Sequence, residues 1–170
     1  IPFYKIGTFG KTPDAYISRE IYNEYRTKYS FPKNGDILIS ASGTIGRTVR
    51  YDGEPTFFQD SNIVWIDNDE RQVLNDYLYV FYKYCNWQPS KGATISRLYN
   101  NNLVSIKIIF PSSYEGQKSI FNKINVVSSE TKKLQAIYEQ KIKEMDELKK
   151  SILQKAFNGE LNTTKDIELL

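Results

Sequence analysis

The second half of the chain carries a long helical pattern that a small domain cannot cover by itself. From Glu115 to about Asn158 the sequence is rich in Lys, Glu, Gln, Ile and Leu and contains no proline. Down to Tyr138 its apolar positions are spaced alternately four and three residues apart, as in a coiled coil. Such a helix of about 40 residues would be about 60 Å long at a rise of 1.5 Å per residue. We therefore expect one long coiled-coil α-helix that pairs with a partner.

The ends of this helix and its pairing surface can be assigned to residues. Ser112 and Glu115 have the spacing of a capping box, and Asn158-Gly159 supplies a stop. Lys141 interrupts the apolar seam once. The residues expected to pair are Ile120, Ile124, Val127, Leu134, Tyr138, Met145, Leu148 and Ile152. A dimerisation helix of this kind carries no chemistry, so a scaffold protein remains an alternative.

Residues 1–111 have the pattern of a mixed α+β domain, followed by helix and tail over 112–170. Short runs rich in β-branched and aromatic residues are bounded by Gly, Pro, Asn and Ser, as strands are. One helix is expected over 76–84, with Asn75 as its N-cap. We expect a twisted mixed sheet, with strands over 2–6, 36–40, 45–51, 62–66 and 104–110.

Composition excludes several classes of function. The chain has no histidine, which rules out a Ser-His-Asp triad and a histidine general base. Its one cysteine, Cys85, cannot form an internal disulfide and suits the cytoplasm. No segment resembles a membrane span or a signal peptide. Gly10-Lys11-Thr12 resembles the end of a P-loop, but Lys5 stands where that motif needs glycine.

Three polar clusters are candidates for nucleic-acid contacts. The first, residues 40–47, combines two glycines with hydroxyl groups and an arginine, which suits a phosphate backbone. In the second, residues 91–102, Arg and Lys could read guanine and Asn could read adenine. Residues 59–62 form the third. The candidate DNA-binding residues are Lys11, Thr12, Ser42, Thr44, Arg47, Gln59, Ser61, Asn62, Lys91, Thr94, Arg97, Tyr99 and Asn100.

Each polar cluster also has a plainer interpretation. The first could be a glycine-rich β-turn, and the others could be ordinary solvated loops. The net charge of +3 is weak evidence for nucleic acid, although 37–51 and 77–114 contain no acidic residue. If the clusters do bind DNA, we expect their side chains to gather on one face of the domain.

In order along the chain, five stretches resemble type I restriction-modification specificity subunits. These are GDILISASGTIGRT, FFQDSNIVWI, NDYLYVFYKY, KGATISRLYNNNLVSIKIIFP and LKKSILQKAFNGEL. The resemblance implies a target-recognition domain over 1–111 and a conserved spacer helix over 112–170. The chain departs from the family's pattern in two ways: it has only one recognition domain, and it lacks the family's usual opening strand region. We therefore expect a piece of a longer protein.

The resemblance also implies a function and partners. A specificity subunit is not an enzyme: it reads one half of a bipartite site in double-stranded DNA. It positions modification subunits, which use S-adenosylmethionine, and restriction subunits that cleave DNA. No cofactor is expected in the chain itself and no metal. Its helix would pair with a second recognition unit or with another copy of itself.

Overall fold

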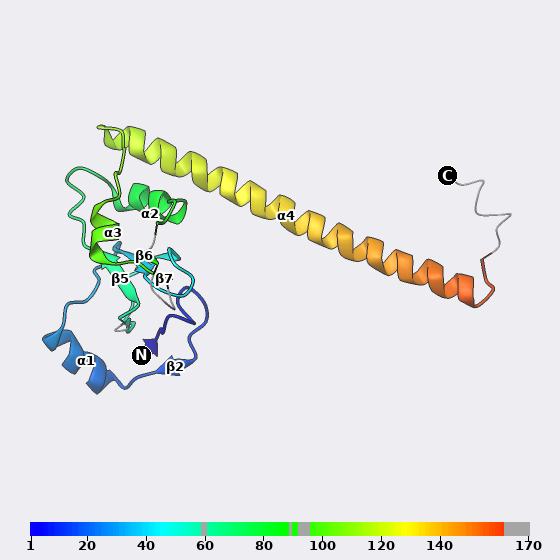
Figure 1. Cartoon of the computed structure of the whole chain (residues 1–170), viewed down its shortest axis with the longest axis horizontal. Helices are drawn as coiled ribbons and strands as arrows, with labels where there is room; N and C mark the ends of the chain where they lie inside the picture. Colours follow the sequence, from blue (N-terminus) through cyan, green and yellow to red (C-terminus); the bar gives the residue numbers. More distant parts are fainter. Residues whose placement is uncertain (59–60, 89, 92–95, 162–170) are drawn as a thin grey trace. The chain divides into compact units, whose positions relative to one another are not determined.

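A computed structural model describes residues 1–58, 61–88, 90–91 and 96–161 (Figure 1). The chain divides into two compact units, residues 1–122 and 123–170. Its elements in order are β1 (Pro2–Phe3), β2 (Ala15–Tyr16), α1 (Arg19–Lys28), β3 (Ile37–Ser40), β4 (Thr48–Arg50), β5 (Ile63–Ile66), α2 (Asn75–Lys83), β6 (Ser90–Lys91), β7 (Ser96–Arg97), α3 (Asn100–Val104) and α4 (Tyr114–Phe157). The predicted α+β class is confirmed.

Strand β3 is the centre of the first unit. It pairs antiparallel with β4 on one side and with β5 on the other, and all four of its residues are buried. Because successive strand side chains point to opposite faces, β3 supplies two cores. Ile37 and Ile39 pack in one with Leu78, Tyr82 and Leu98. On the other face, Leu38 packs with the aromatic side chains of Phe9, Tyr51 and Phe58.

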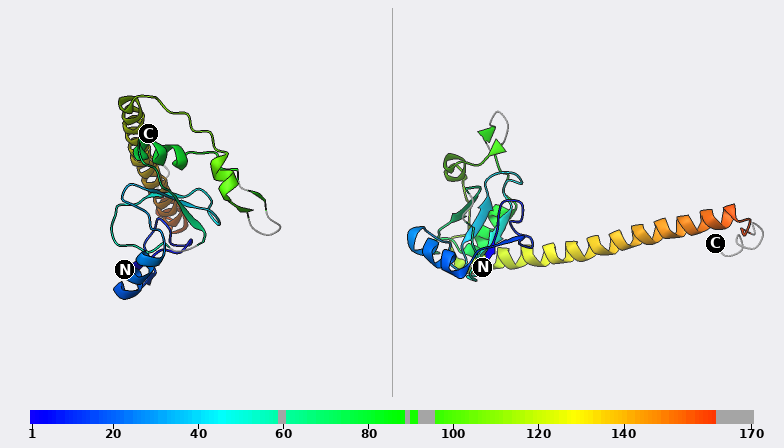
Figure 2. Two further views of the ribbon diagram at one scale, coloured as in Figure 1. Left: turned by 90° about the vertical axis from the view of Figure 1, so that its left-hand side faces the viewer. Right: turned by 90° about the horizontal axis from the view of Figure 1, so that it is seen from below.

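The remaining described strands form two small sheets, β1–β2 and β6–β7, both antiparallel. The expectation of one mixed sheet is therefore wrong for the described strands. Parallel pairing is confined there to an isolated bridge between Phe3 and Phe57. The β6–β7 hairpin stands beside α3 in both views of Figure 2.

The predicted strands differ in outcome. The strands predicted over 36–40 and 62–66 are confirmed as β3 and β5. The strands predicted over 45–51 and 2–6 are also present, as β4 and β1, but each is shorter than predicted. The strand predicted over 104–110 is wrong, because α3 ends at Val104 and the described residues 105–110 join no strand ladder. Ile106 and Ile108 pack on the β3 core, while Ile109 is exposed. The alternating pattern thus arises from one-sided packing of an extended segment.

The sequence pattern does not predict the two short helices α1 and α3. In α1, Ser18 is the N-cap, and its hydroxyl oxygen accepts a hydrogen bond from the Ile21 N–H at 3.2 Å. Tyr22 is buried on this helix and packs edge-to-face against Phe31. In α3, the Asn102 side chain accepts a hydrogen bond from the Tyr99 N–H at 2.8 Å. Both helices depend on a capping side chain within a polar segment.

Helix α2 confirms the helix expected over 76–84, but its N-cap is not Asn75. Leu74 occupies that position and Asn75 is the first helical residue. The Asn75 N–H donates instead to the carboxylate of Glu70 at 2.8 Å, and its side-chain oxygen accepts from Asn68 at 2.9 Å. Glu70 has a φ of +56°, a backbone conformation that is rare for a residue other than glycine. The side-chain hydrogen bonds of the loop before α2 hold it there.

Helix α4 begins one residue later than the capping box predicts. Ser113, rather than Ser112, accepts the Gly116 N–H at its hydroxyl oxygen, 3.1 Å away. The predicted stop is confirmed: Gly159 has a φ of +72°, and its N–H donates to the Ala156 carbonyl at 3.2 Å. The Glu160 N–H donates to the Lys155 carbonyl, which completes a Schellman motif.

The first turn of α4 is fixed to the loop before α2 by Gln117, which is fully buried. Its amide oxygen accepts the Leu74 N–H at 2.8 Å. Its amide nitrogen donates to the carbonyl oxygens of Gln72 at 3.0 Å and Pro111 at 2.9 Å. The Tyr114 hydroxyl adds a contact to the Arg71 carbonyl at 2.7 Å. The Gln117 side chain thus satisfies backbone groups of three residues from two segments, the loop before α2 and the segment just before α4.

Replacing Gln117 should therefore destabilise the folded chain. Gln117→Ala leaves the Leu74 N–H and two carbonyl oxygens without their partner, which should lower the free energy of unfolding by about 2–3 kcal/mol. Urea denaturation measures this. Gln140→Ala, at an exposed position of the same helix, is the control and should change stability by less than about 0.5 kcal/mol. Equal effects of the two substitutions would contradict this role of Gln117.

Candidate nucleic-acid interface

The loop between β3 and β4, residues 41–47, is closed by the buried hydroxyl of Ser40. That oxygen accepts the Arg47 N–H at 2.8 Å, and the hydroxyl donates to the Thr44 carbonyl. The Ser40 N–H donates to the Arg47 carbonyl at 2.9 Å, and the Gly46 N–H donates to the Ser40 carbonyl at 2.9 Å. The polar cluster predicted from the sequence is therefore a tight loop whose base is internally bonded.

The two glycines of this loop differ in their surroundings. Gly43 has a φ of +64°, and a methyl group added there would have its nearest neighbour on Ile6, 3.8 Å away. Gly46 has a φ of +80°, and a Cβ there would overlap the indole ring of Trp87. Trp87 is itself stacked on Tyr82, with ring centroids 5.7 Å apart. Gly46 thus allows the loop to lie directly against an aromatic pair.

Three loops that are far apart in sequence meet at the end of β3. Ser42 forms an antiparallel bridge with Arg97, and the Leu98 N–H donates to the Ala41 carbonyl at 2.8 Å. The Ala41 N–H donates to the Asn62 carbonyl at 2.7 Å. The Arg97 guanidinium donates to the Ser61 carbonyl at 2.5 Å. Residues from all three predicted polar clusters are therefore brought together.

A hollow of about 440 Å³ lies where these loops meet. Its apolar part comes from Ala41 and Leu98, both buried, and from the half-buried Val64. None of the described residues that line it is acidic. The polar residues that line it are Ser61, Arg97, Tyr99, Asn100 and Asn101.

A second group of candidates forms around Arg47. Its guanidinium donates to the Phe9 carbonyl at 2.8 Å, so part of its hydrogen-bonding capacity holds the segment 5–11. Phe9 is fully buried, while the Lys11 and Thr12 that follow it are exposed. The Lys11 N–H donates to the Thr8 carbonyl at 2.9 Å, which closes this turn. Lys11 and Arg47 thus lie on adjoining segments.

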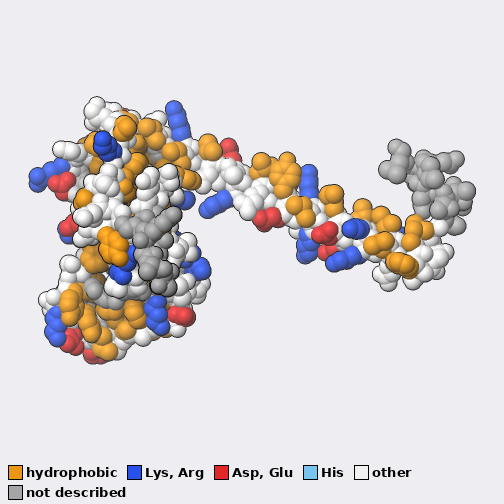
Figure 3. Space-filling view, in the orientation of Figure 1, with side chains coloured by type: hydrophobic (Ala, Val, Ile, Leu, Met, Phe, Trp, Pro, Cys, Tyr) orange, Lys and Arg blue, Asp and Glu red, His pale blue; other side chains and the backbone are white. Residues whose placement is uncertain are grey.

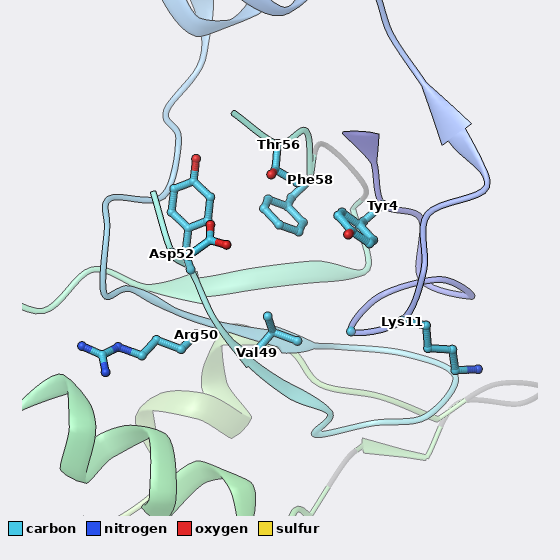
Figure 4. Close-up of a pocket in the computed structure, with 9 residues that line it drawn as sticks. Tyr4, Lys11, Val49, Arg50, Asp52, Thr56 and Phe58 are labelled. Carbon is cyan, nitrogen blue, oxygen red and sulfur yellow. The ribbon is translucent and has the colours of Figure 1, made fainter. Parts of the chain in front are cut away.

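A smaller hollow of about 240 Å³ lies beside Lys11 (Figure 4). The rings of Tyr4 and Phe58 line it and stack with centroids 5.5 Å apart. Burial raises the pKa of Tyr51 to about 12, so its hydroxyl stays protonated and donates to the Glu54 carbonyl. Figure 4 shows the charged ends of Lys11 and Arg50 pointing away from the hollow, and Arg50 pairs with Asp76. Aromatic packing of Tyr4 and Phe58 thus forms part of the wall of this hollow.

Similarity to known protein families identifies the family to which the chain belongs. The model of the type I restriction modification DNA specificity domain matches residues 1–144. The chain belongs to this family. A putative type I restriction enzyme specificity subunit from Haemophilus influenzae is 63% identical over 131 residues, which cover 76% of the chain and 34% of that relative. The aligned part is thus about a third of the relative's length. No solved structure matches the chain.

In the structure of this specificity domain, most of the predicted site residues fall into two groups. Ser42, Ser61, Asn62, Arg97, Tyr99 and Asn100 lie at or next to the larger hollow, and Lys11, Thr12 and Arg47 lie on the adjoining segments. Thr44 is exposed in the loop after β3, and Lys91 lies in β6. Gln59 and Thr94 lie outside the described residues. That all of them share one face stays a prediction.

Sequence reasoning missed the apolar residues of the hollow and Asn101. Ala41 follows the buried strand β3 and Val64 lies within the apolar run of β5, so their sequence pattern indicates core packing alone. Asn101 lies inside a predicted polar cluster, but nothing in the sequence distinguishes it from Asn100 or Asn102. The side chain of Asn102 has backbone partners at Tyr99 and Gln88, whereas Asn100 and Asn101 have no side-chain hydrogen bond within the described part of the chain.

The predicted pairing residues of α4 differ in burial on either side of the end of the first unit. Ile120 and Ile124 are partly buried. The pairing residues from Val127 onward are open to solvent, and Figure 3 shows apolar side chains recurring along α4 among charged ones, which in this helix are Lys, Asp and Glu. The exposed fractions are 61% for Val127, 52% for Leu134, 57% for Tyr138, 68% for Met145, 60% for Leu148 and 47% for Ile152.

Two other kinds of site find no support in the described residues. No helix among them combines the length and apolar character that crossing a membrane requires. Within the same ranges, no three Cys, Asp or Glu side chains gather closely enough to hold a metal ion.

The glycine pair offers a direct test of how the loop after β3 is positioned. Gly43→Ala should cost about 1 kcal/mol, since an alanine is strained at positive φ but has room. Gly46→Ala carries the same strain and also collides with Trp87, so its cost should reach about 3 kcal/mol. Thermal and urea unfolding of both variants measure this. Equal destabilisation by the two substitutions would show that Trp87 does not hold the loop.

Proposed function

We propose that this chain is the DNA-reading part of a type I restriction enzyme specificity subunit, and that it recognises one half of a bipartite target in double-stranded DNA. The observation that carries the proposal is the meeting of three separate loops at the end of β3, around Ser42, Ser61 and Arg97. Membership of the specificity-domain family and the name of the Haemophilus relative support it.

The chemistry of the loops suits a duplex. Hydroxyl and amide groups and exposed backbone N–H groups bind phosphate and sugar, and these contacts set the position of a protein on DNA. Lys11 and Arg47 would add cationic contacts, which attract the duplex irrespective of its sequence. The hollow lined by Tyr99, Asn100 and Asn101 would face base edges in the groove.

The chain is proposed to recognise DNA without catalysis and without a cofactor of its own. It has no histidine and no Pro-Pro pair of the kind found in adenine methyltransferase motifs. Methylation, with S-adenosylmethionine as donor, would be carried out by the modification subunits, and cleavage by restriction subunits recruited to the complex. The scaffold alternative without DNA affinity is less favoured, because it gives no role to the meeting of the three loops.

Helix α4 is proposed to join this recognition unit to its partners as a coiled coil. Its exposed residues recur at heptad spacing down to Tyr138, and Lys141 interrupts them once. In a longer subunit the partner would be a second conserved helix. In this chain alone, a second copy would supply it, and antiparallel pairing would give a two-fold arrangement suited to a palindromic bipartite site.

DNA binding should depend steeply on salt and on Lys11. Each phosphate contact releases counterions, so the affinity of the chain assembled with modification subunits should fall as salt rises. Lys11→Ala should weaken binding to every sequence alike and lower the salt slope by about one unit. Fluorescence anisotropy over a salt series measures both quantities.

Lys28→Ala is the matched control for this titration. It removes the same charge from α1, where Lys28 is paired with Glu24 at 2.6 Å, and should leave the slope unchanged. Arg47→Ala should lower the slope as Lys11→Ala does, and should also lower the melting temperature because Arg47 holds the Phe9 carbonyl. An affinity that does not respond to salt would contradict DNA recognition by this chain.

The isolated chain should self-associate through α4. Burying an exposed leucine stabilises an interface by about 1.5–3 kcal/mol, and a carboxylate on the seam would lose this and add a buried charge. Leu134→Asp and Leu148→Asp should therefore shift the chain to monomer in sedimentation velocity. Glu139→Asp, off the seam, is the control. A wild-type chain that stays monomeric at high micromolar concentration would contradict the pairing.

A further inference from the structure

The larger hollow combines two kinds of surface that a base pair can distinguish. Its apolar part is formed by Ala41 after β3, Val64 in β5 and Leu98 after β7, which the backbone bonds at the end of β3 hold together. Its polar edge carries the exposed amides of Asn100 and Asn101 at the start of α3. Neither amide has a hydrogen-bond partner among the described residues, so both are available to a ligand.

The four base pairs differ in what they offer such a surface. In the major groove, thymine presents a methyl group, for which apolar side chains are the natural contact. Adenine presents N7 as an acceptor and N6 as a donor, which one Asn amide can bind together. A G·C pair presents no methyl group and is read best by a cation. An apolar surface beside free amides therefore matches an A·T pair.

Arg97, the cation among the described lining residues, already uses part of its hydrogen-bonding capacity within the chain. Its guanidinium donates to the Ser61 carbonyl at 2.5 Å, and its backbone pairs with Ser42. To bind guanine with two hydrogen bonds, the Arg97 guanidinium would have to turn its remaining N–H groups toward the base. Arg97 is thus placed to hold the loops around the hollow, and the free amides are placed to read a base.

We propose that this hollow reads an A·T base pair, with the thymine methyl group against Val64 and the neighbouring apolar surface and the adenine edge on the amide of Asn100 or Asn101. The inference rests on the proposed function and names the base pair that one part of the interface selects. Its volume of about 440 Å³ leaves room for the edge of a base pair as well as for the methyl group.

Base analogues test this without changing the protein. The whole specificity subunit, assembled with its modification subunits, is bound to a duplex carrying its target, mapped beforehand from its N6-methylated adenines. Each thymine is replaced in turn by uracil, which removes only the methyl group. Each adenine is replaced by 7-deazaadenine, which removes only N7. At one base pair, uracil should weaken binding about 4-fold, the value of one buried methyl group, and 7-deazaadenine about 10-fold.

Protein variants then assign the sensitive pair to the hollow. In Val64→Ala the loss caused by uracil should shrink to less than about 2-fold, because the methyl group has lost its contact. Val73→Ala removes the same two methyl groups from the same core and should keep the full loss. Asn100→Ala or Asn101→Ala should abolish the effect of 7-deazaadenine, whereas Asn125→Ala, an exposed position of α4, should not. If Val64→Ala fails to fold, Val64→Thr replaces it.

The outcomes separate this inference from the function on which it rests. Tight, salt-dependent binding with no thymine-methyl effect at any position would overturn the A·T inference and leave DNA recognition standing. So would a uracil effect that is the same in Val64→Ala and Val73→Ala. An effect of 7-deazaguanine that Arg97→Ala removes would show that the hollow reads guanine. Failure to bind the mapped target at all would contradict the proposed function.

Discussion

The burial of β3 on both faces is the constraint on which the first unit depends. Ile37 and Ile39 enter one core and Leu38 enters the other, so the strand cannot shift by one residue without exposing all of them. Its last residue, Ser40, is buried as well and closes the loop that follows. The same strand that organises the core therefore delivers Ser42 to the place where Arg97 and Ser61 meet it.

The start of α4 is held by polar bonds rather than by apolar packing alone. The buried amide of Gln117 contacts the backbone at Gln72, Leu74 and Pro111, so its oxygen and both of its N–H groups are engaged. Buried polar networks specify one arrangement because any displacement leaves groups unsatisfied. The first turn of α4 is thereby built into the unit that carries the loops proposed to bind DNA.

The sequence predicts those parts whose signals are local. β3, β5 and the end of α4 at Gly159 follow from side-chain patterns and turn residues. The capping of α1 by Ser18 is also local but lies in a polar segment without a clear apolar period. Contacts between distant segments could not be predicted. The bond from Arg97 to Ser61, the apolar surface supplied by Val64 and the burial of Gln117 all depend on tertiary packing. The partner proposed for α4 would likewise not follow from one chain's sequence.

The central claim is that DNA lies against the loops at the end of β3, and hydrogen–deuterium exchange tests it most directly. The subunit, assembled with modification subunits, is compared with and without its target duplex. We predict slower exchange at the backbone amides of residues 41–46 and 98–104 with target DNA, and no change in α1. Protection confined to α1, or none at either loop with DNA bound, would contradict it.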